Sequence, residues 1–427
     1  MPPTRARHVT LAFMLALAVI TYIDRVSLST AAPFIRNELG LSSIQLGWAL
    51  STFAWAYALF EIPGGWLGDR LGPRRVLMRI VIWWSIFTAA TGQVWSLTSL
   101  VVCQALFGAG EAGAFPNITR VFTSWIPKVE RERAQALLWL ATRWGGAFTP
   151  LAVRTILVYV SWHTMFAIFG VIGLVWAVAF YRWHRDDPAS HPAVNAAELA
   201  LLPPPRSTAT VKGSLPWAEL LAHRSVLLLC LQYACLAYGW FFYVTWLPTY
   251  LRDARHTPLE GSPLLLTLLG GAPLLFGGVG CLVSGWLGPR LAAKLGSVTT
   301  ARRILAITGF VGASMAILVF TRIQDPVKAM LVLGLAGFLN DFVMPNAWAS
   351  TMDIGGRYAG TVSGAMNMFG GIAGACSTLI VGYILAWTGQ DWTLALYASA
   401  SIYLLGAICW FFLDPHTPIE QPEAIQA

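Results

Sequence analysis

Long apolar runs constrain this chain more than any other feature of its sequence. Residues 226–251, for example, contain no charged residue, and comparable runs recur along the 427 residues. A helix needs about 20 consecutive apolar residues to cross a bilayer. Hydrophobic residues make up 56% of the chain and charged residues only 11%, against roughly 25% charged residues in soluble domains. This composition excludes a soluble enzyme, a disordered protein and a secreted disulfide scaffold.

The apolar supply is sufficient for about twelve spanning helices. A β-barrel is excluded because barrel strands alternate polar and apolar residues, whereas these runs are continuous. We therefore expect an all-α membrane protein with two pseudo-symmetric bundles of six helices. The predicted spans are 9–31, 45–64, 76–93, 96–117, 134–157, 163–182, 225–248, 263–288, 304–321, 329–349, 359–386 and 391–413.

The spans are grouped as six, a gap and six. We expect a first bundle at 1–182, a polar and proline-rich linker loop at 183–223, and a second bundle with a short tail at 224–427. Basic residues concentrate in the loops on the side shared by the two termini, while the other side carries few, among them Arg36, Arg322 and Lys328. Loops rich in Lys and Arg stay in the cytoplasm. Both termini and the linker are therefore expected to be cytoplasmic, in a cell membrane such as a bacterial inner membrane.

The two predicted halves share a short repeat. The sequence Gly-Trp-Leu-Gly-Asp-Arg-Leu at 65–71 returns at 285–291 with proline in place of the aspartate, and both copies follow the second span of their half. Transporters built from repeated halves place their substrate site at the interface of the repeats, near the bilayer midplane.

The repeat, the grouping of the spans and the segment at 64–75 together resemble the major facilitator superfamily. That segment is similar to the signature loop between helices 2 and 3 of the family, which implies a conformational latch formed by Asp69, with the basic residues Arg70 and Arg74 beside it. Asp69 would cap a helix terminus and pair with a basic side chain. The second copy departs from the pattern, because Pro289 replaces the acid and weakens any latch there.

Two further stretches are similar to the anion:cation symporter family, which includes bacterial galactonate, glucarate and hexuronate permeases and mammalian sialin. They are residues 21–25 in the first span, and residues 107–117 in the fourth span with the following segment 125–134. The resemblance covers essentially the whole chain. It implies a transporter and not an enzyme.

Charged residues within the spans are functional candidates, because a charge at mid-bilayer costs about 2.5–3.5 kcal/mol even on insertion scales. Arg25 offers a planar fork that suits a carboxylate, and the resemblance implies that it binds the substrate. Asp24 and Glu111 are the predicted proton-coupling residues. Glu111 lies in a glycine-rich stretch, where burial disfavours the charged form of a carboxyl group. A structural ion pair of Asp24 or Arg25, and a neutral packing role of Glu111, remain the alternatives.

Gln104 is a departure from the resembling permeases, which have an arginine seven residues before the glutamate. We hypothesise that Arg143, in the fifth span, takes over this role and lowers the cost of ionising Asp24 or Glu111. Both Gln104 and Arg143 are candidate substrate-binding residues, and a purely structural role of Arg143 is the alternative.

Four polar or aromatic side chains complete the candidate substrate site, each on its resemblance to cavity residues of galactonate-type relatives. Tyr22 and Tyr57 belong to the first and second spans, Trp348 to the tenth and Asn367 to the eleventh. Asp341, beside Asn340, is a further acid or hydroxyl acceptor. Helix packing is the alternative role for each of them.

We predict proton-coupled uptake of an organic anion such as a sugar acid (a hexonate, hexarate or hexuronate) by alternating access. The alternatives are an organic-anion or sugar-phosphate exchanger, an aromatic-acid permease and a membrane solute sensor. The expected partners are the substrate, protons and lipid, without nucleic acid, for a protein that is a monomer. No cofactor or metal is expected, because there is no Walker sequence and the six cysteines lie in apolar runs without zinc-ligand spacing.

Overall fold

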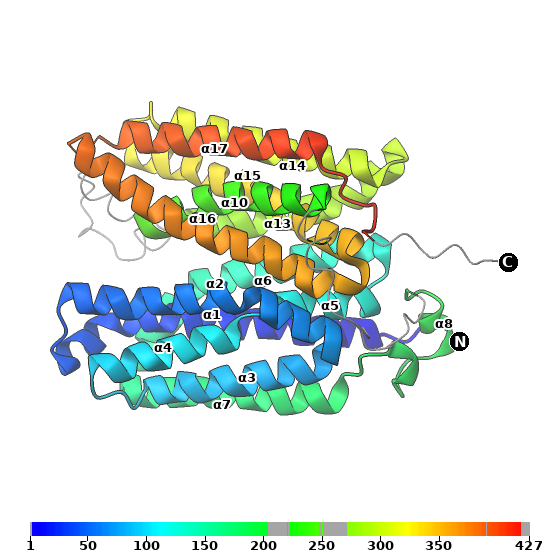
Figure 1. Ribbon diagram of the computed structural model, residues 1–427, viewed down its shortest axis with the longest axis horizontal. Helices are drawn as coiled ribbons and strands as arrows, with labels where there is room; N and C mark the ends of the chain where they lie inside the picture. Colours follow the sequence, from blue (N-terminus) through cyan, green and yellow to red (C-terminus); the bar gives the residue numbers. More distant parts are fainter. Residues whose placement is uncertain are drawn as a thin grey trace. The chain divides into compact units, whose positions relative to one another are not determined.

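The computed structural model describes residues 2–203, 220, 223–246, 250, 271–389 and 391–419. Regular secondary structure in this part of the chain is helical throughout (Figure 1), which confirms the predicted all-α membrane fold. Of the predicted linker loop, residues 204–219 lie outside the described residues, as do residues 263–270 of the eighth predicted span.

The main helices are α1 (Ala6–Leu39), α2 (Ser43–Leu71), α3 (Pro73–Thr91), α4 (Leu97–Glu111), α5 (Ala114–Trp125), α6 (Arg131–Tyr159), α7 (Trp162–Trp183), α8 (Ala196–Leu199), α10 (Arg224–Phe241), α13 (Ala272–Leu295), α14 (Val298–Phe320), α15 (Pro326–Gly355), α16 (Ala359–Trp387) and α17 (Trp392–Phe412). Short helices are η1 (Lys128–Glu130), η2 (Pro188–Ser190), η3 (Phe242–Trp246) and η4 (Gly356–Tyr358).

Within the described residues, each of the twelve predicted spans coincides with helix. Eight helical stretches of these residues are long and apolar enough to cross a membrane by length and composition alone. The fourth predicted span, 96–117, differs in detail, because the structure divides it into α4 and α5 and continues it to Trp125. The seventh continues from α10 into the π-helix η3.

The chain forms two compact units. Unit 1 contains residues 1–134, 144–216 and 355–365. Within it α3 runs alongside α7 and α2 alongside α4 (Figure 1). One buried apolar cluster joins α1 to α4, α6 and α7, with Ile35, Leu100, Val153 and Phe166 at most 2% exposed. Lipid tails are as apolar as these side chains, so close van der Waals packing rather than removal from water stabilises the contact between the helices.

Unit 2 contains residues 135–143, 217–354 and 366–427. Within it α17 packs against both α10 and α14, and α13 packs against α14. The nine residues 135–143 of α6 thus cluster with helices from the second half of the sequence, and the start of α16 clusters with unit 1.

Several helices begin at a polar residue that the sequence places directly before an apolar run. The hydroxyl of Ser42 accepts from the backbone N–H of Gln45, whose side chain accepts from the N–H of Ser42. Ser96 and Ser99 form the same reciprocal arrangement at the start of α4. These reciprocal arrangements, known as capping boxes, provide hydrogen-bond acceptors for backbone N–H groups that have no partner within the helix.

The segment before α1 is fastened to α8. The Glu198 carboxylate is fully buried and accepts hydrogen bonds from Thr4 Oγ1 at 2.5 Å and from the backbone N–H groups of Ala6 and Arg7 at 3.2 and 3.1 Å. Asn195 accepts from the Thr4 N–H and donates to the carbonyl of Pro2. Glu198 thereby caps α1 from a distant part of the chain, at the end where a helix dipole favours negative charge.

Candidate functional site

An ion pair between α1 and α4 lies at the centre of the candidate site in unit 1. Arg25 Nε donates to Glu111 Oε1 over 2.6 Å, and the side chains are 20% and 1% exposed. Removing two charges from water is costly, and only close pairing compensates for it. The structure thus brings together two of the residues that the sequence singled out.

Aromatic rings surround the Arg25 guanidinium. Its Cζ atom lies 4.3 Å from the ring centroid of Tyr57, 5.3 Å from Phe53, 5.5 Å from Tyr22 and 5.9 Å from Phe115. Cation–π contacts of this kind stabilise a desolvated cation. The predicted site residues Tyr22 and Tyr57 therefore both lie at Arg25, while Phe53 and Phe115 were missed. A signal existed for Phe53, since it precedes Tyr57 by four residues, which is about one helical turn.

Glu111 ends α4, at a break in the fourth span. Gly113 has a φ of +83°, in the left-handed region, and α5 begins directly after it. Pro116 has no N–H to donate to the carbonyl of Ala112, so a continuous helix would lack that hydrogen bond. The Asn117 amide donates to the Gly113 carbonyl over 2.7 Å and to that of Gly64 over 2.9 Å.

The break places Glu111 at the carboxyl end of a helix, where the helix dipole disfavours negative charge. Its side chain is also fully buried. Arg25 is the cation that offsets both effects.

Asp24 is the second acid of unit 1. It is 3% exposed, and the Trp84 side chain is a hydrogen-bonding neighbour of its carboxylate. Glu111 lies within electrostatic range of it. Two carboxyl groups this close and this buried cannot easily both be charged.

Gln104 is buried on α4 and donates its amide to Thr91 Oγ1 on α3 over 3.2 Å. The cation paired with Glu111 is Arg25 on α1, rather than a side chain at position 104 of α4. The hypothesis expects Arg143 to supply a cation for Asp24 or Glu111. In the structure, Glu111 pairs with Arg25, and Arg143 pairs with Asp341.

The Arg143–Asp341 pair belongs to unit 2. Both side chains are almost completely buried, and two hydrogen bonds join them. The sequence identified both residues as charges within spans, but it gave no indication that they are partners.

Trp348 and Asn367, the other candidates of the second half, also belong to unit 2. Trp348 is fully buried, its indole N–H donates to Tyr233 Oη over 3.3 Å, and its ring centroid lies 5.2 Å from that of Trp139. Asn367 is partly exposed on α16. Their predicted contact with substrate stays a prediction.

Asp69 caps the first turn of α16. Its carboxylate accepts from the N–H groups of Gly360 and Thr361 over 3.0 and 2.7 Å and from the Thr361 hydroxyl over 2.8 Å. Arg120 Nε lies 3.4 Å from it. These contacts have the chemistry predicted for a latch, a helix cap and a basic partner. Gly65 allows the close approach, since a Cβ there would lie 2.2 Å from the carbonyl oxygen of Gly360.

The two basic residues predicted beside Asp69 have other contacts. Arg70 lies over the ring of Trp66, with 5.3 Å from Cζ to the centroid. Arg74 donates from Nε and Nη2 to the carbonyl of Tyr181 at the end of α7, over 3.1 and 2.6 Å. They hold the ends of α2, α3 and α7, whereas Arg120 pairs with Asp69.

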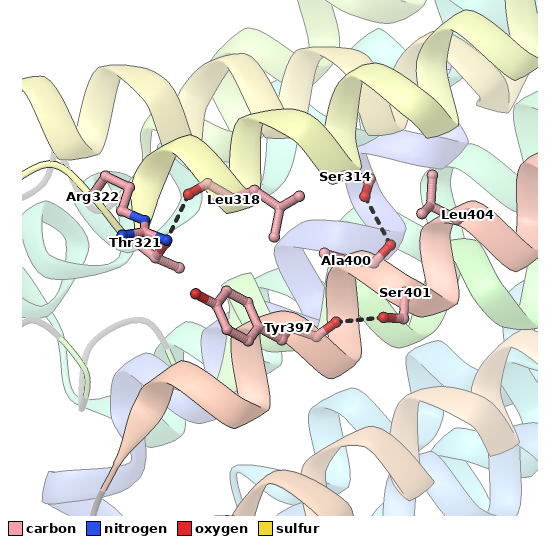
Figure 2. Close-up of a pocket in the computed structure, with 8 residues that line it drawn as sticks. All are labelled: Ser314, Leu318, Thr321, Arg322, Tyr397, Ala400, Ser401 and Leu404. Carbon is pink, nitrogen blue, oxygen red and sulfur yellow. Dashed lines mark hydrogen bonds between the residues drawn. The ribbon is translucent and has the colours of Figure 1, made fainter.

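A pocket of unit 2 lies between α14 and α17 (Figure 2). Ser314, which donates to the Ala400 carbonyl over 2.9 Å, lies toward one end of it and Arg322 toward the other. None of the predicted site residues lines it. The pocket therefore does not indicate where the substrate binds.

Comparisons with known proteins agree with this architecture. The family model of the Major Facilitator Superfamily matches residues 14–378. The chain is 36% identical to the probable sulfoacetate transporter of Cupriavidus necator, covering 98% of this chain and 96% of that protein. It is 31% identical to the D-galactonate transporter of Escherichia coli O6:H1, covering 96% of each.

Among solved structures, the chain is similar to FucP, the fucose:proton symporter of Escherichia coli. The TM-score is 0.73 at 15% identity, over 98% of this chain and 100% of that one, and this likeness concerns the fold alone. The predicted family, the twelve-helix fold and the expectation of a transporter rather than an enzyme are confirmed. With its family model, its relatives and its fold in agreement, the chain belongs to the major facilitator superfamily of membrane transporters.

Proposed function

We propose that this transporter carries a small organic anion together with protons, by alternating access, across a bacterial inner membrane with both termini in the cytoplasm. The relatives named for sulfoacetate and D-galactonate transport support an anion with a carboxylate or sulfonate group. A sugar acid and a sulfonated carboxylic acid are therefore the first substrates to test.

The observation that carries the proposal is the Arg25–Glu111 pair. An arriving carboxylate competes with Glu111 for the Arg25 fork. Once Arg25 turns to the substrate, Glu111 is a buried carboxyl group at a helix C-terminus without a cation, and it takes up a proton. Substrate and proton then occupy the site together, which is the requirement for symport.

Asp24 is the second proton carrier in this scheme, because it is a buried carboxyl group within electrostatic range of Glu111. Tyr22 and Tyr57 hold the Arg25 guanidinium by their ring faces and present hydroxyl groups to substrate. Asp69 holds the start of α16 and is released when the carrier changes conformation. Trp348, Asn367 and Gln104 complete the proposed substrate contacts.

Anion exchange is the alternative, and it also requires buried cations. Unit 1 supplies Arg25 and unit 2 supplies Arg143, each paired with its own carboxylate. Exchange and symport differ in whether substrate alone moves protons.

The test uses the full chain in proteoliposomes with a pH-sensitive dye. Sulfoacetate, D-galactonate, glucarate and a hexuronate are added separately on the acidic side. Symport predicts that one compound moves protons with no anion inside the vesicle. Labelled substrate that enters only against internal anion, without a proton signal, contradicts symport and supports exchange. A matched variant, Glu38→Gln, changes a half-exposed carboxylate at the far end of α1 and is expected to behave as wild type.

A further inference from the structure

Unit 2 contains a buried ion pair that the scheme above does not use. Arg143 Nε lies 2.5 Å from Asp341 Oδ2, and Arg143 Nη2 lies 2.8 Å from Asp341 Oδ1. The side chains are 4% and 0% exposed. This is the side-on, two-bond geometry in which arginine binds a planar carboxylate.

Two tryptophan rings and a glycine surround the ion pair. The Arg143 guanidinium lies over the ring of Trp240, with 3.6 Å from Cζ to the centroid, and 5.5 Å from that of Trp139. Gly277 makes room for the carboxylate, since a Cβ there would lie 2.4 Å from Asp341 Oδ2. An external carboxylate or sulfonate presents the same pair of oxygens as Asp341 and is able to replace it.

A chain of neutral groups continues behind the carboxylate. Asn340 Nδ2 donates to Asp341 Oδ1 over 2.8 Å, and Tyr403 Oη donates to Asn340 Oδ1 over 2.7 Å. Gly239 gives Tyr403 its space, because a Cβ there would lie 2.2 Å from the ring. The carboxylate thus accepts from the Asn340 amide on one side, which Tyr403 holds in place, and from arginine on the other.

The titratable groups that face Asp341 come from four elements. They are Arg143 on α6, Cys281 on α13, Tyr243 in η3 and Tyr403 on α17. Arg143 is the cation among these described groups. If it is drawn away, Asp341 is left buried with no cation among these groups, and an unpaired buried charge is costly.

We propose that Arg143 is a second anion-binding side chain of the transporter, and that Asp341 leaves it and becomes protonated when a carboxylate or sulfonate group of the substrate binds there. A proton from the bulk solution on the side where the substrate enters forms an O–H bond with a carboxylate oxygen of Asp341. That bond breaks when the substrate departs, the proton passes to the solution on the other side, and the ionised Asp341 returns to Arg143. No electron is transferred, and the cycle restores the starting pair.

This inference rests on the proposed transport of an organic anion and adds a binding group and a proton acceptor to it. A matched structural pair lies in the same unit. Arg302 Nη2 donates to Asp353 Oδ2 over 2.8 Å, and Arg302 Nη1 donates to the carbonyl of Pro415 over 2.8 Å. Because Arg302 is also tied to the backbone, this pair serves as the control for the loss of a buried ion pair.

The experiment is calorimetric titration of the purified full chain in neutral detergent with sulfoacetate and, separately, D-galactonate. Two buffers with different protonation enthalpies give the number of protons taken up on binding. Asp341→Asn removes the competing charge and keeps the shape, so we expect at least about tenfold tighter binding and about one proton fewer per substrate. Arg143→Gln is expected to weaken binding at least about tenfold.

The neutral double variant Arg143→Gln with Asp341→Asn keeps the inference testable if a single variant does not fold. The inference predicts a folded protein that binds at least about tenfold more weakly than wild type, whereas a merely structural pair predicts wild-type affinity. The control double variant Arg302→Gln with Asp353→Asn is expected to leave affinity and proton number unchanged.

Unchanged or weaker binding by Asp341→Asn overturns the inference, as does an unchanged proton number or the absence of binding by every variant and the wild type. Failure of the proposed symport has a different signature. In that case the substrate moves no protons in vesicles that contain the wild type, while the affinity change of Asp341→Asn is still observed.

Discussion

Arg25 and Glu111 are separated by 86 residues in sequence, and their side chains lie 2.6 Å apart in unit 1. One cation therefore serves both the internal carboxylate and, in our proposal, the substrate. Transport should depend on how Arg25 is shared between them.

Replacing Arg25 by glutamine removes the guanidinium group that is proposed to bind the substrate carboxylate. Because hydrogen bonds to a charged group contribute about 1.5–3 kcal/mol, we expect the KM of the transported anion to rise at least about tenfold. Uptake of labelled substrate over a concentration series measures it. Arg36→Gln is the control, since Arg36 lies at the end of the same helix and donates to the Leu41 carbonyl. Equal effects of the two substitutions would contradict a substrate role for Arg25.

Glu111→Gln keeps the shape and hydrogen-bonding groups but cannot release a proton. We expect accumulation driven by a pH gradient to be lost while exchange of labelled for unlabelled substrate continues. Counterflow and pH-driven uptake, measured on the same vesicles, separate the two activities. Retained pH-driven accumulation would show that Glu111 is a packing residue.

The break in the fourth span should depend on Gly113. A Cβ at this position would lie 2.6 Å from Cα of Gly64, and φ is +83°. Gly40 also has a positive φ, of +62°, but a Cβ there would meet no described atom within 4 Å. Gly40→Ala should therefore lose only the roughly 1–2 kcal/mol of left-handed strain, and Gly113→Ala should lower the Tm considerably more. Equal Tm values of the two variants would contradict a close contact between Gly113 and Gly64 that the added methyl group disrupts.

Asp69→Asn keeps a helix cap and removes an ion pair. Asparagine caps a helix about as well as aspartate, so the main loss is the ion pair with Arg120, and this loss should favour the conformation in which α16 is released. Asp391 caps α17 through the N–H of Thr393 over 2.8 Å, so Asp391→Asn is the matched control. We expect similar Tm changes, but a changed transport rate only for Asp69→Asn. A rate change in neither variant would remove Asp69 from the cycle.

His184 predicts how stability depends on pH. It follows α7, outside the predicted span, and burial lowers its pKa to about 3. The nearest oxygen of Asp186 is 3.9 Å away, too far for a hydrogen bond. Between the unfolded pKa of about 6.5 and 3, the unfolded chain binds more protons, so stability falls as the pH falls, by at most about 1.4 kcal/mol per unit.

His184→Phe, which keeps the stacking on Phe180, should reduce this decline in Tm between about pH 7 and pH 5. His163→Phe is the control, because that ring is partly exposed beside Glu38. An identical decline in His184→Phe and wild type would contradict the assignment.

Sequence reasoning identified the charges but not their partners. Asp24, Arg25, Glu111, Arg143 and Asp341 were found because charge in an apolar run is rare. Which helices meet depends on packing between distant segments, and helical periodicity carries no information about that. The pairing of Arg143 with Asp341 therefore could not be predicted.

The helix break between α4 and α5 could be predicted in part from the sequence. Gly113 and Pro116 are both signals for an interruption, yet a continuous span at 96–117 fits the apolar pattern equally well. The decisive contacts are those of Asn117 with Gly64 and Gly113. They join two helices and have no local signature. Asp69, in contrast, was predictable, because a short motif contains both the acid and the glycine that admits its partner.

The cap that Glu198 forms on α1 has a consequence for anyone who labels this protein. A fluorescent protein or affinity tag attached ahead of Thr4 is joined directly to the segment that bonds Asn195 and Glu198 and leads into the helix with Asp24 and Arg25. We therefore expect such a fusion to disturb the transport helix. Reporters are better placed on the exposed positions of other helices, with activity compared before and after removal of the tag.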